Sequence, residues 1–193
     1  ARFVADNLYR YFVSDEPDEA EVKVLMKVYF ESDYEIKPML RHIFNSDSFK
    51  KATYEKVRWP VDHVVNIVNT TGRHTDPYEG GLKKLAVASA LMGQRLLDPP
   101  SVEGWHTGRE WIDSSFLIER VNFAANMLGD TNTPGMRTII GRISTGKTSI
   151  TADELIDSCL YELGCVEISS KTKDILLEES NLPAGIQIDD GFG

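Results

Sequence analysis

Residues 92–126 read MGQRLLDPPSVEGWHTGREWIDSSFLIERVNFAAN, and this stretch decides how the chain is organised. One helical pattern ends at Gly93 and another begins after Trp111, with a connector rich in proline, glycine and tryptophan between them. The double proline at 99–100 cannot continue a helix, because proline lacks the amide hydrogen and clashes with the preceding turn. Two tryptophans in so short a connector indicate that it packs against the helices on either side.

The helical period extends from this connector toward both ends of the chain. Apolar residues recur at spacings of three and four in at least six segments, which is typical of amphipathic helices. The run after Trp59-Pro60 contains several valines and could form a strand, but its 3-4 spacing and its leading proline favour a helix. The sequence therefore predicts an all-α fold: an irregular multi-helix domain with a Trp/Pro-rich connector and a small C-terminal helix pair.

Four parts are expected along the chain, namely a main helical domain at 1–130, an irregular linker at 131–150, a two-helix extension at 151–180 and a mobile tail at 181–193. Thr151 and Glu154 have the spacing of a capping box, which opens the first helix of the extension. Ser32 or Asp33 is the expected cap of a helix that carries Pro38, where the proline marks a later start or a kink.

The charge of the chain is uneven. The net charge is -9, yet residues 1–147 carry 19 basic and 20 acidic side chains, whereas residues 148–193 carry 2 and 10. An acidic C-terminal part repels phosphate backbones, so we expect no nucleic-acid partner. No apolar run reaches the roughly 20 residues that a membrane span needs. The chain begins at Ala1 inside a helical pattern, so we expect it to be a piece of a longer protein.

Cysteine and histidine positions give no metal or cofactor site. Cys159 is expected on the apolar face of a helix as a buried thiol, and a disulfide to Cys165 is the alternative if their Cα atoms come within about 7 Å. The four histidines show no ligand spacing among themselves or with a cysteine. We therefore expect no metal and no cofactor.

Residues 141–148, GRISTGKT, fit the spacing of a phosphate-binding P-loop through Gly141, Gly146, Lys147 and Thr148. A P-loop must follow a buried parallel strand and run directly into a helix whose amides face the phosphates. The apolar run directly before this segment is only two residues long, Ile139-Ile140, and the next helix is expected after Thr151. We therefore interpret the match as chance and predict no nucleotide binding.

The connector supplies the candidate ligand-binding residues, which are Trp105, His106, Arg109 and Trp111. In one interpretation both indoles are structural, and Trp105 is largely buried between helices. In the other they form an aromatic platform for a sugar ring or a partner's side chain. Neighbouring ionisable groups would serve a catalytic site only if they gather in one cleft, and no catalytic residue is assigned.

Several short motifs occur together in an order that resembles the C-terminal half of the bacterial family called domain of unknown function 1800. These motifs comprise Arg2, Phe3, Ala5, Leu8, Tyr9, Arg10 and Phe12; Ser46 and Phe49; Arg58, Pro60 and Asp62; Gly93, Gln94, Leu96, Pro99, Pro100, Val102, Gly104 and Trp105; and Trp111 and Arg120. The resemblance covers residues 1–128 and, more loosely, 151–179. His106-Thr107-Gly108 departs from the family's pattern, so we expect the backbone of this loop to differ locally from that of the family.

The resemblance implies no activity, cofactor or catalytic residue. It implies a missing N-terminal half as a partner and a bacterial, exported or envelope-associated setting. The leading hypothesis is a non-catalytic interaction or scaffold module of a larger protein, with a protein partner and no membrane span in this piece. The alternative is the C-terminal half of a hydrolase-like enzyme that acts on glycans or another envelope polymer.

Overall fold

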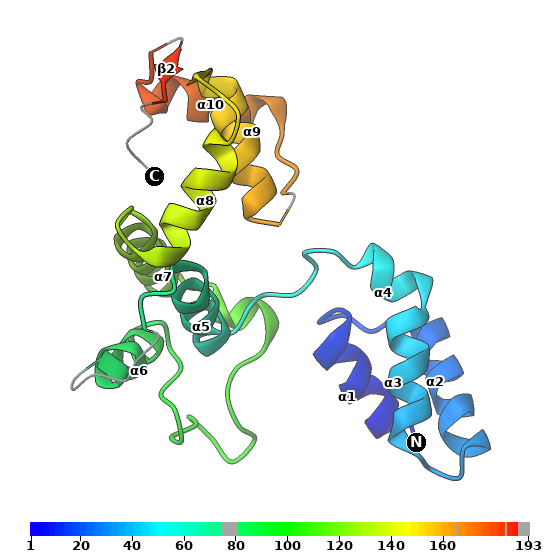
Figure 1. Ribbon diagram of the computed structural model, residues 1–193. Helices are drawn as coiled ribbons and strands as arrows, with labels where there is room; N and C mark the ends of the chain where they lie inside the picture. The colour runs from blue at the N-terminus through cyan, green and yellow to red at the C-terminus, as the bar shows by residue number, and fades with distance from the viewer. Residues whose placement is uncertain (75–80, 165, 184, 189–193) are drawn as a thin grey trace. The chain divides into compact units, whose positions relative to one another are not determined.

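The computed structural model describes residues 1–74, 81–164, 166–183 and 185–188. Within these residues the chain is built almost entirely of helices (Figure 1). They are α1 (Arg2–Phe12), α2 (Glu19–Glu31), α3 (Ile36–Asn45), α4 (Asp47–Lys51), α5 (Pro60–Thr71), α6 (Gly81–Leu91), the 3-10 helix η1 (Gly108–Trp111), α7 (Ser114–Leu128), α8 (Pro134–Ser144), α9 (Ala152–Glu162) and α10 (Ser170–Ser180). The all-α prediction is confirmed.

Two compact units make up the chain, and each is described by itself. The first contains residues 1–64 and 82–122, and the second contains residues 65–81 and 123–193. Because these boundaries fall inside α5 and α7, each of those helices contributes to both units.

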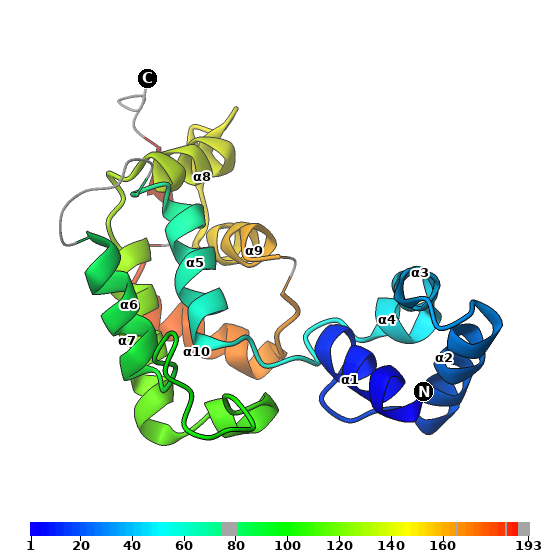
Figure 2. The same cartoon turned by 90° about the horizontal axis from the view of Figure 1, so that it is seen from below.

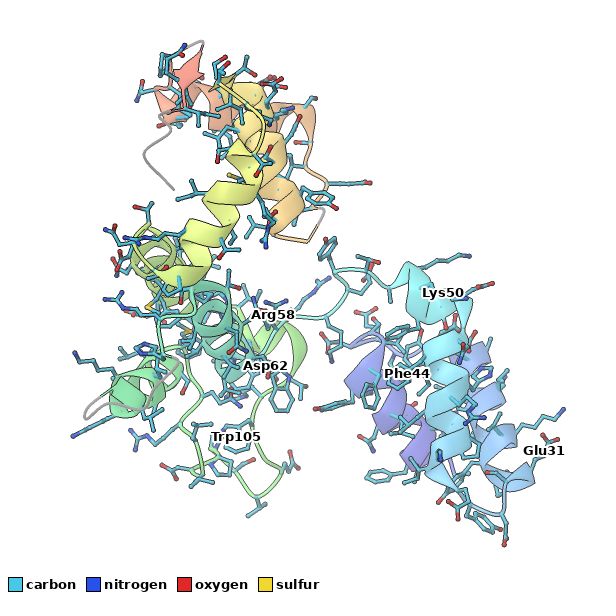
Figure 3. The ribbon with its side chains drawn as sticks, in the orientation of Figure 1. Glu31, Phe44, Lys50, Arg58, Asp62 and Trp105 are labelled. Carbon is cyan, nitrogen blue, oxygen red and sulfur yellow. The ribbon has the colours of Figure 1, made fainter. Side chains whose placement is uncertain are left out.

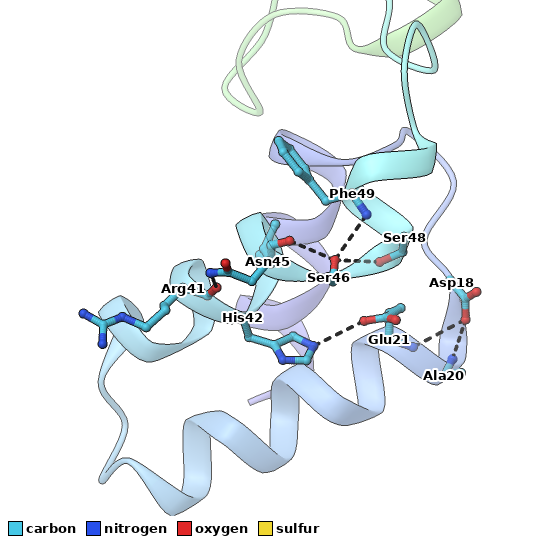
Figure 4. A network of polar contacts seen from close by, with 10 residues as sticks. Asp18, Ala20, Glu21, Arg41, His42, Asn45, Ser46, Ser48 and Phe49 are labelled. Atoms are coloured by element: carbon cyan, nitrogen blue, oxygen red, sulfur yellow. Dashed lines mark hydrogen bonds and ion pairs between the residues drawn. The ribbon is translucent and has the colours of Figure 1, made fainter.

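The core of the first unit lies among α1, α2 and α3, which run side by side in Figures 1 and 2. Its fully buried side chains are Ala5, Tyr9, Val13, Val22, Leu25, Met39 and Ile43. They recur at spacings of three and four on each helix, so burying one stripe per helix produces the core. His42 on α3 contacts Glu21 on α2 at 3.4 Å, which adds a polar link at the edge of this core (Figure 4).

Side-chain caps fix where several helices begin. The Asp18 carboxylate accepts hydrogen bonds from the amides of Ala20 and Glu21 at the start of α2, and the Ser46 hydroxyl accepts one from Phe49 in α4 (Figure 4). Thr151 and Glu154 form the predicted capping box of α9. These bonds satisfy backbone amides that have no partner within the first turn of a helix.

The cap expected for α3 was wrong. Glu35 is its N-cap, while Asp33 and Tyr34 take left-handed φ values of 54° and 66° in the turn before it. Because Asp33 and Tyr34 form this turn, α3 starts after Glu35, and neither Ser32 nor Asp33 can be its N-cap. Pro38 is therefore the third residue of α3, within the first turn, where the missing amide hydrogen costs no hydrogen bond.

The segment 131–150 is not an irregular linker, because α8 occupies residues 134–144. Pro134 stands at the first helical position, which suits its fixed φ. Apolar side chains follow at the helical spacing and are half-buried, namely Met136, Ile139, Ile140 and Ile143. The two glycines and the threonine within α8 disguise that stripe, because they are poor helix formers.

Two short strands also lie in the second unit. β1 (Ser149–Ile150) pairs antiparallel with β2 (Ile186–Gln187), with Ile150 opposite Ile186. The expectation of a mobile tail at 181–193 is thus wrong for residues 186–187, since backbone pairing holds them. Residues 184 and 189–193 lie outside the described residues. No helix among the described residues has the length and apolar content to cross a membrane.

Candidate functional site

The connector between α6 and α7 is held by polar contacts at both ends. Gln94 is buried, and its side-chain oxygen accepts a hydrogen bond from the amide of Val61 at 2.9 Å. This bond joins the end of α6 to the first turn of α5. The Trp105 indole donates to the carbonyl of Arg95 at 3.2 Å, so the ring ties the connector back onto its own beginning. Figure 3 labels Trp105 on the connector and Arg58 and Asp62 where α5 begins.

Gly108 lets the connector approach the turn between α1 and α2. Its φ is +57°, and a Cβ atom at this position would lie 2.9 Å from the Asp15 carboxyl group. Both the left-handed backbone and the close approach favour glycine. Gly108 begins η1, whose last residue, Trp111, is completely buried.

Trp111 and Trp59 form an aromatic cluster with two neighbouring rings. Their own ring centroids are 6.3 Å apart, Tyr11 lies 6.4 Å from Trp59, and His106 lies 5.8 Å from Trp111 in an edge-to-face arrangement. Such pairs stabilise by about 0.5–1.5 kcal/mol beyond the apolar area they bury. The cluster joins α1, the start of α5 and η1.

A cavity of about 340 Å³ opens beside this cluster, and its lining residues are Asn7, Arg10, Tyr11, Asp15, Lys56, Trp59 and Thr107. Its volume is near the lower end of what small-ligand sites have. Lys56 donates to the carboxylate of Asp15 at 3.0 Å and to the carbonyl of Arg10, so the cationic groups of the wall already have partners. The exposed ring of Tyr11 and the half-buried ring of Trp59 give the cavity its aromatic surface.

Arg120 is the unusual ionisable group of this unit. Its side chain lies inside the protein, with 8% of the residue exposed, and its Nη1 donates to the carbonyl of Arg58 at 2.9 Å. Burial lowers the pKa of its guanidinium. The carbonyl of Arg120 itself lies 3.3 Å from Nε2 of His63 on α5.

His63 has a lowered pKa, chiefly because it is partly buried. The charges of Arg120 and Arg58 lower the pKa further, while the contact with the Arg120 carbonyl opposes this. The unfolded chain therefore binds a proton more readily than the folded one. It follows that the folded state loses stability as the pH falls through the ordinary histidine pKa of 6.5.

We expect replacement of His63 by glutamine to remove this loss. The free energy of unfolding should fall less in His63→Gln than in the unchanged chain between about pH 8 and about pH 5.5. Urea titrations at the two pH values provide the measurement, with His42→Gln as the matched control on another helix. Equal losses in the His63→Gln and unchanged chains would show that His63 does not carry the effect.

The structure separates the four candidate residues of the connector. His106 and Trp111 meet, and His106 also contacts Glu110 at 3.4 Å. Trp105 is half-buried and donates to the Arg95 carbonyl, whereas Arg109 is exposed. The fully buried indole is thus Trp111, contrary to the expectation for Trp105. Asp113, a neighbouring carboxylate, caps α7 through Ser115.

The sequence interpretation missed the residues that line the cavity. Tyr11, Lys56 and Trp59 belong to three segments, and only folding brings them beside Thr107. Trp59 carried a usable signal, because a tryptophan directly before a helix-starting proline is a natural contact for another aromatic residue. Asp15 and Lys56 carried none, since isolated charged residues in turns are common.

The P-loop-like residues lie in a different arrangement from a phosphate site. Gly141 belongs to α8, and the amide of Lys147 donates to the carbonyl of Ser144, so a helix precedes the loop where a P-loop needs a strand. Lys147 lines a cavity of about 530 Å³ in the second unit, together with Arg142, Ile143, Asp157, Ser158, Tyr161 and Glu162. The two carboxylates in that wall oppose phosphate binding.

Cys159 is exposed, so the expectation of a buried thiol is wrong. Cys165 lies outside the described residues, and the possible pairing of the two cysteines stays a prediction. Among the residues that the structure describes, no group of three or more histidine, cysteine or acidic side chains could hold a metal ion.

Comparison with known proteins identifies a family. A family described as "Protein of unknown function (DUF1800)" matches residues 1–185, which include the whole first unit and all but the last eight residues of the second. No curated protein and no solved structure matches the chain. The match includes both stretches of the resemblance seen in the sequence and adds α8, which lies between them. Since it covers nearly the whole chain, this protein belongs to the DUF1800 family of proteins of unknown function.

Proposed function

We propose that this chain is a non-catalytic helical interaction module that binds another protein through an apolar stripe on α7. The stripe consists of Leu117, Ile118 and Val121, whose exposed fractions are 46%, 59% and 59%. Residues spaced by three and four lie on one face of a helix, so these three side chains form a continuous surface. This exposed stripe is the observation that carries the proposal.

Other exposed apolar residues of the first unit also support a protein partner. Further large apolar side chains are exposed on α6 and the connector of the same unit, namely Leu82, Val87, Leu91, Leu96, Leu97, Val102 and Ile112. Single exposed apolar residues are ordinary, but so many within about 40 residues are typical of a surface that another protein covers. Residues 1–147 are nearly neutral, which suits an apolar interface better than a charged ligand.

The partner that we propose is the N-terminal half of a longer protein, as the family resemblance implies. An amphipathic helix docks its apolar face into a groove of its partner, and the i, i+1, i+4 pattern of α7 fits that mode. We also propose that this protein works in the cell envelope of a bacterium. An interaction module of this kind needs no catalytic group in the connector.

The test is whether the chain co-elutes with the N-terminal half, expressed as a separate polypeptide. We expect a complex with the unchanged chain and its loss in the Leu117→Glu/Val121→Glu double variant, because burying two carboxylates without partners is costly. Asn126→Glu is the matched control, since Asn126 is exposed on α7 but lies away from the stripe. If the double variant still co-elutes, the stripe is not the interface.

The glycan-directed alternative has support from one feature only, the cavity beside Tyr11 and Trp59. Aromatic walls with nearby amide and hydroxyl groups suit a sugar ring, and Asn7 and Thr107 supply those groups. Glycoside hydrolysis ordinarily needs two carboxyl groups, and Asp15, which is paired with Lys56, is the one acidic residue in this lining. The cavity therefore supports ring binding more than hydrolysis.

A further inference from the structure

Three buried N–H donors lie around the Arg58–Trp59 dipeptide in the first unit. Nε and Nη2 of Arg120 and Nε1 of Trp111 have no hydrogen-bond partner among the described residues. Arg120 reaches the dipeptide through its bond to the Arg58 carbonyl, and Trp111 reaches it through its ring contact with Trp59. Buried polar atoms are almost always hydrogen-bonded, so three unpaired donor nitrogens on two side chains that both contact this dipeptide require an explanation.

The two free nitrogens of Arg120 have a specific geometry. Nη1 is engaged by the carbonyl of Arg58, which leaves Nε and Nη2 on the other edge of the guanidinium. That edge presents two parallel N–H bonds, which match the two oxygens of a carboxylate. The bond to Arg58 holds the plane of the group, so the edge is oriented before any ligand arrives.

The charge around Arg120 is also uncompensated. Among the parts of the chain that the structure describes, no carboxylate lies within ion-pair distance of its guanidinium, and the nearby ionisable groups are Arg58 and His63. A buried charge without a partner destabilises the fold strongly, whereas a paired one does not. Both the free donors and the missing counter-charge call for the same kind of group, an anion that only accepts hydrogen bonds.

We propose that Arg120 is the receptor for a carboxylate, which binds its Nε–Nη2 edge at the Arg58–Trp59 dipeptide, with the Trp111 indole as an additional donor. A monoanion with two oxygens fits one guanidinium edge, while a phosphate dianion needs more donors and more positive charge than these residues offer. Trp59 is half-buried and also lines the cavity described above, so the proposal places the entrance for the carboxylate beside its ring.

This inference is independent of the protein-docking proposal. Arg120 belongs to the buried face of α7, whereas Leu117, Ile118 and Val121 belong to its exposed face. A carboxylate can come from a small acid or from an aspartate or glutamate side chain of a partner. Both sources present the same two oxygens, so small acids probe the site without the partner.

The experiment follows the Arg Nε–H and Trp indole N–H signals of the ¹⁵N-labelled chain by NMR during titration with sodium acetate. Sodium chloride at equal ionic strength is the control, and phosphate and a short glutamate-containing peptide are the further probes. We expect the Arg120 and Trp111 signals to shift and saturate with acetate and with the peptide. The signals of Arg109 and Trp105, which are outside the site, should follow the chloride series.

Arg120→Lys keeps the charge but removes the two-nitrogen edge, so it should lose the saturable response of the Trp111 signal, while Arg109→Lys should keep it. If Arg120→Lys does not fold, the titration of the unchanged chain decides. Shifts that match the chloride series with both acetate and the peptide, or saturation with phosphate but with neither carboxylate probe, would overturn the proposal. A response to the peptide alone would assign the carboxylate to a partner's side chain, and a response to acetate alone would assign it to a small acid.

Discussion

Replacement of Trp111 by alanine is expected to destabilise the protein by about 3–5 kcal/mol, the usual range for removal of a large aromatic side chain from a core. Trp111 has no exposed surface, and its ring contacts those of Trp59 and His106. Its loss leaves a cavity where η1 meets the start of α5. Chemical denaturation followed by circular dichroism measures the effect.

The matched control for this prediction is Trp105→Ala. Trp105 is half-buried, and its indole donates a hydrogen bond to the carbonyl of Arg95. We expect a clearly smaller loss than at Trp111, because less apolar area leaves the interior. If the two variants lose equal stability, the connector depends on both indoles alike, and the assignment of Trp111 as the central one is wrong.

The second large effect is expected at Gly135 in α8. A Cβ atom there would lie 1.9 Å from the carbonyl oxygen of Thr70 and 2.7 Å from the carbonyl carbon of Thr71, both at the end of α5. Since both are backbone atoms, no side chain can rotate away, and α8 must shift. Gly135→Ala should therefore cost about 3 kcal/mol or more, at the upper end of what overpacking does.

Gly141 in the same helix provides the opposite result. A Cβ atom at Gly141 meets no other atom within 4 Å. Gly141→Ala should stabilise α8 by about 0.5–1 kcal/mol, because alanine loses less backbone entropy than glycine in a helix. Thermal unfolding of the two variants side by side checks both signs. If Gly135→Ala melts like the unchanged chain, α5 and α8 do not touch at this glycine.

The helices that sequence predicts well are those whose stripes and caps agree. Pro60 with the spacing of the valines after it led to α5, and Thr151 with Glu154 led to the start of α9, as the structure has them. In both cases the signal is local, because a cap bonds to amides within one turn and a stripe lies on one face.

The errors arose where a local pattern suggested something else. Residues 131–150 were expected to be an irregular linker, although Met136, Ile139, Ile140 and Ile143 follow a helical period within that segment. The two-residue strands could not be predicted, because a pair of residues shows no period. Their pairing partner lies 36 residues away, and sequence alone does not show which segments meet.

The candidate site was predicted only in part for a similar reason. The connector was correctly singled out as packed, but which of its two tryptophans is buried depends on where the chain turns. Gly108 makes that turn against Asp15, a residue nearly 100 positions earlier. Arg120 donates to the carbonyl of Arg58, which is 62 residues earlier in the chain. No residue close to Arg120 in the sequence therefore predicts that its side chain is buried.

The pairing of β1 with β2 has a consequence for how the C-terminal end is used. It closes residues 150–186 into a loop that contains α9 and α10, and the amide of Ile188 adds a bond to the carbonyl of Thr148. The family match ends at residue 185, one position before this closure. A polypeptide trimmed to the family boundary would therefore leave the edge of Ile150 without its partner strand and free the two helices from a tether. Expression boundaries should extend through residue 188, and fusions belong beyond it.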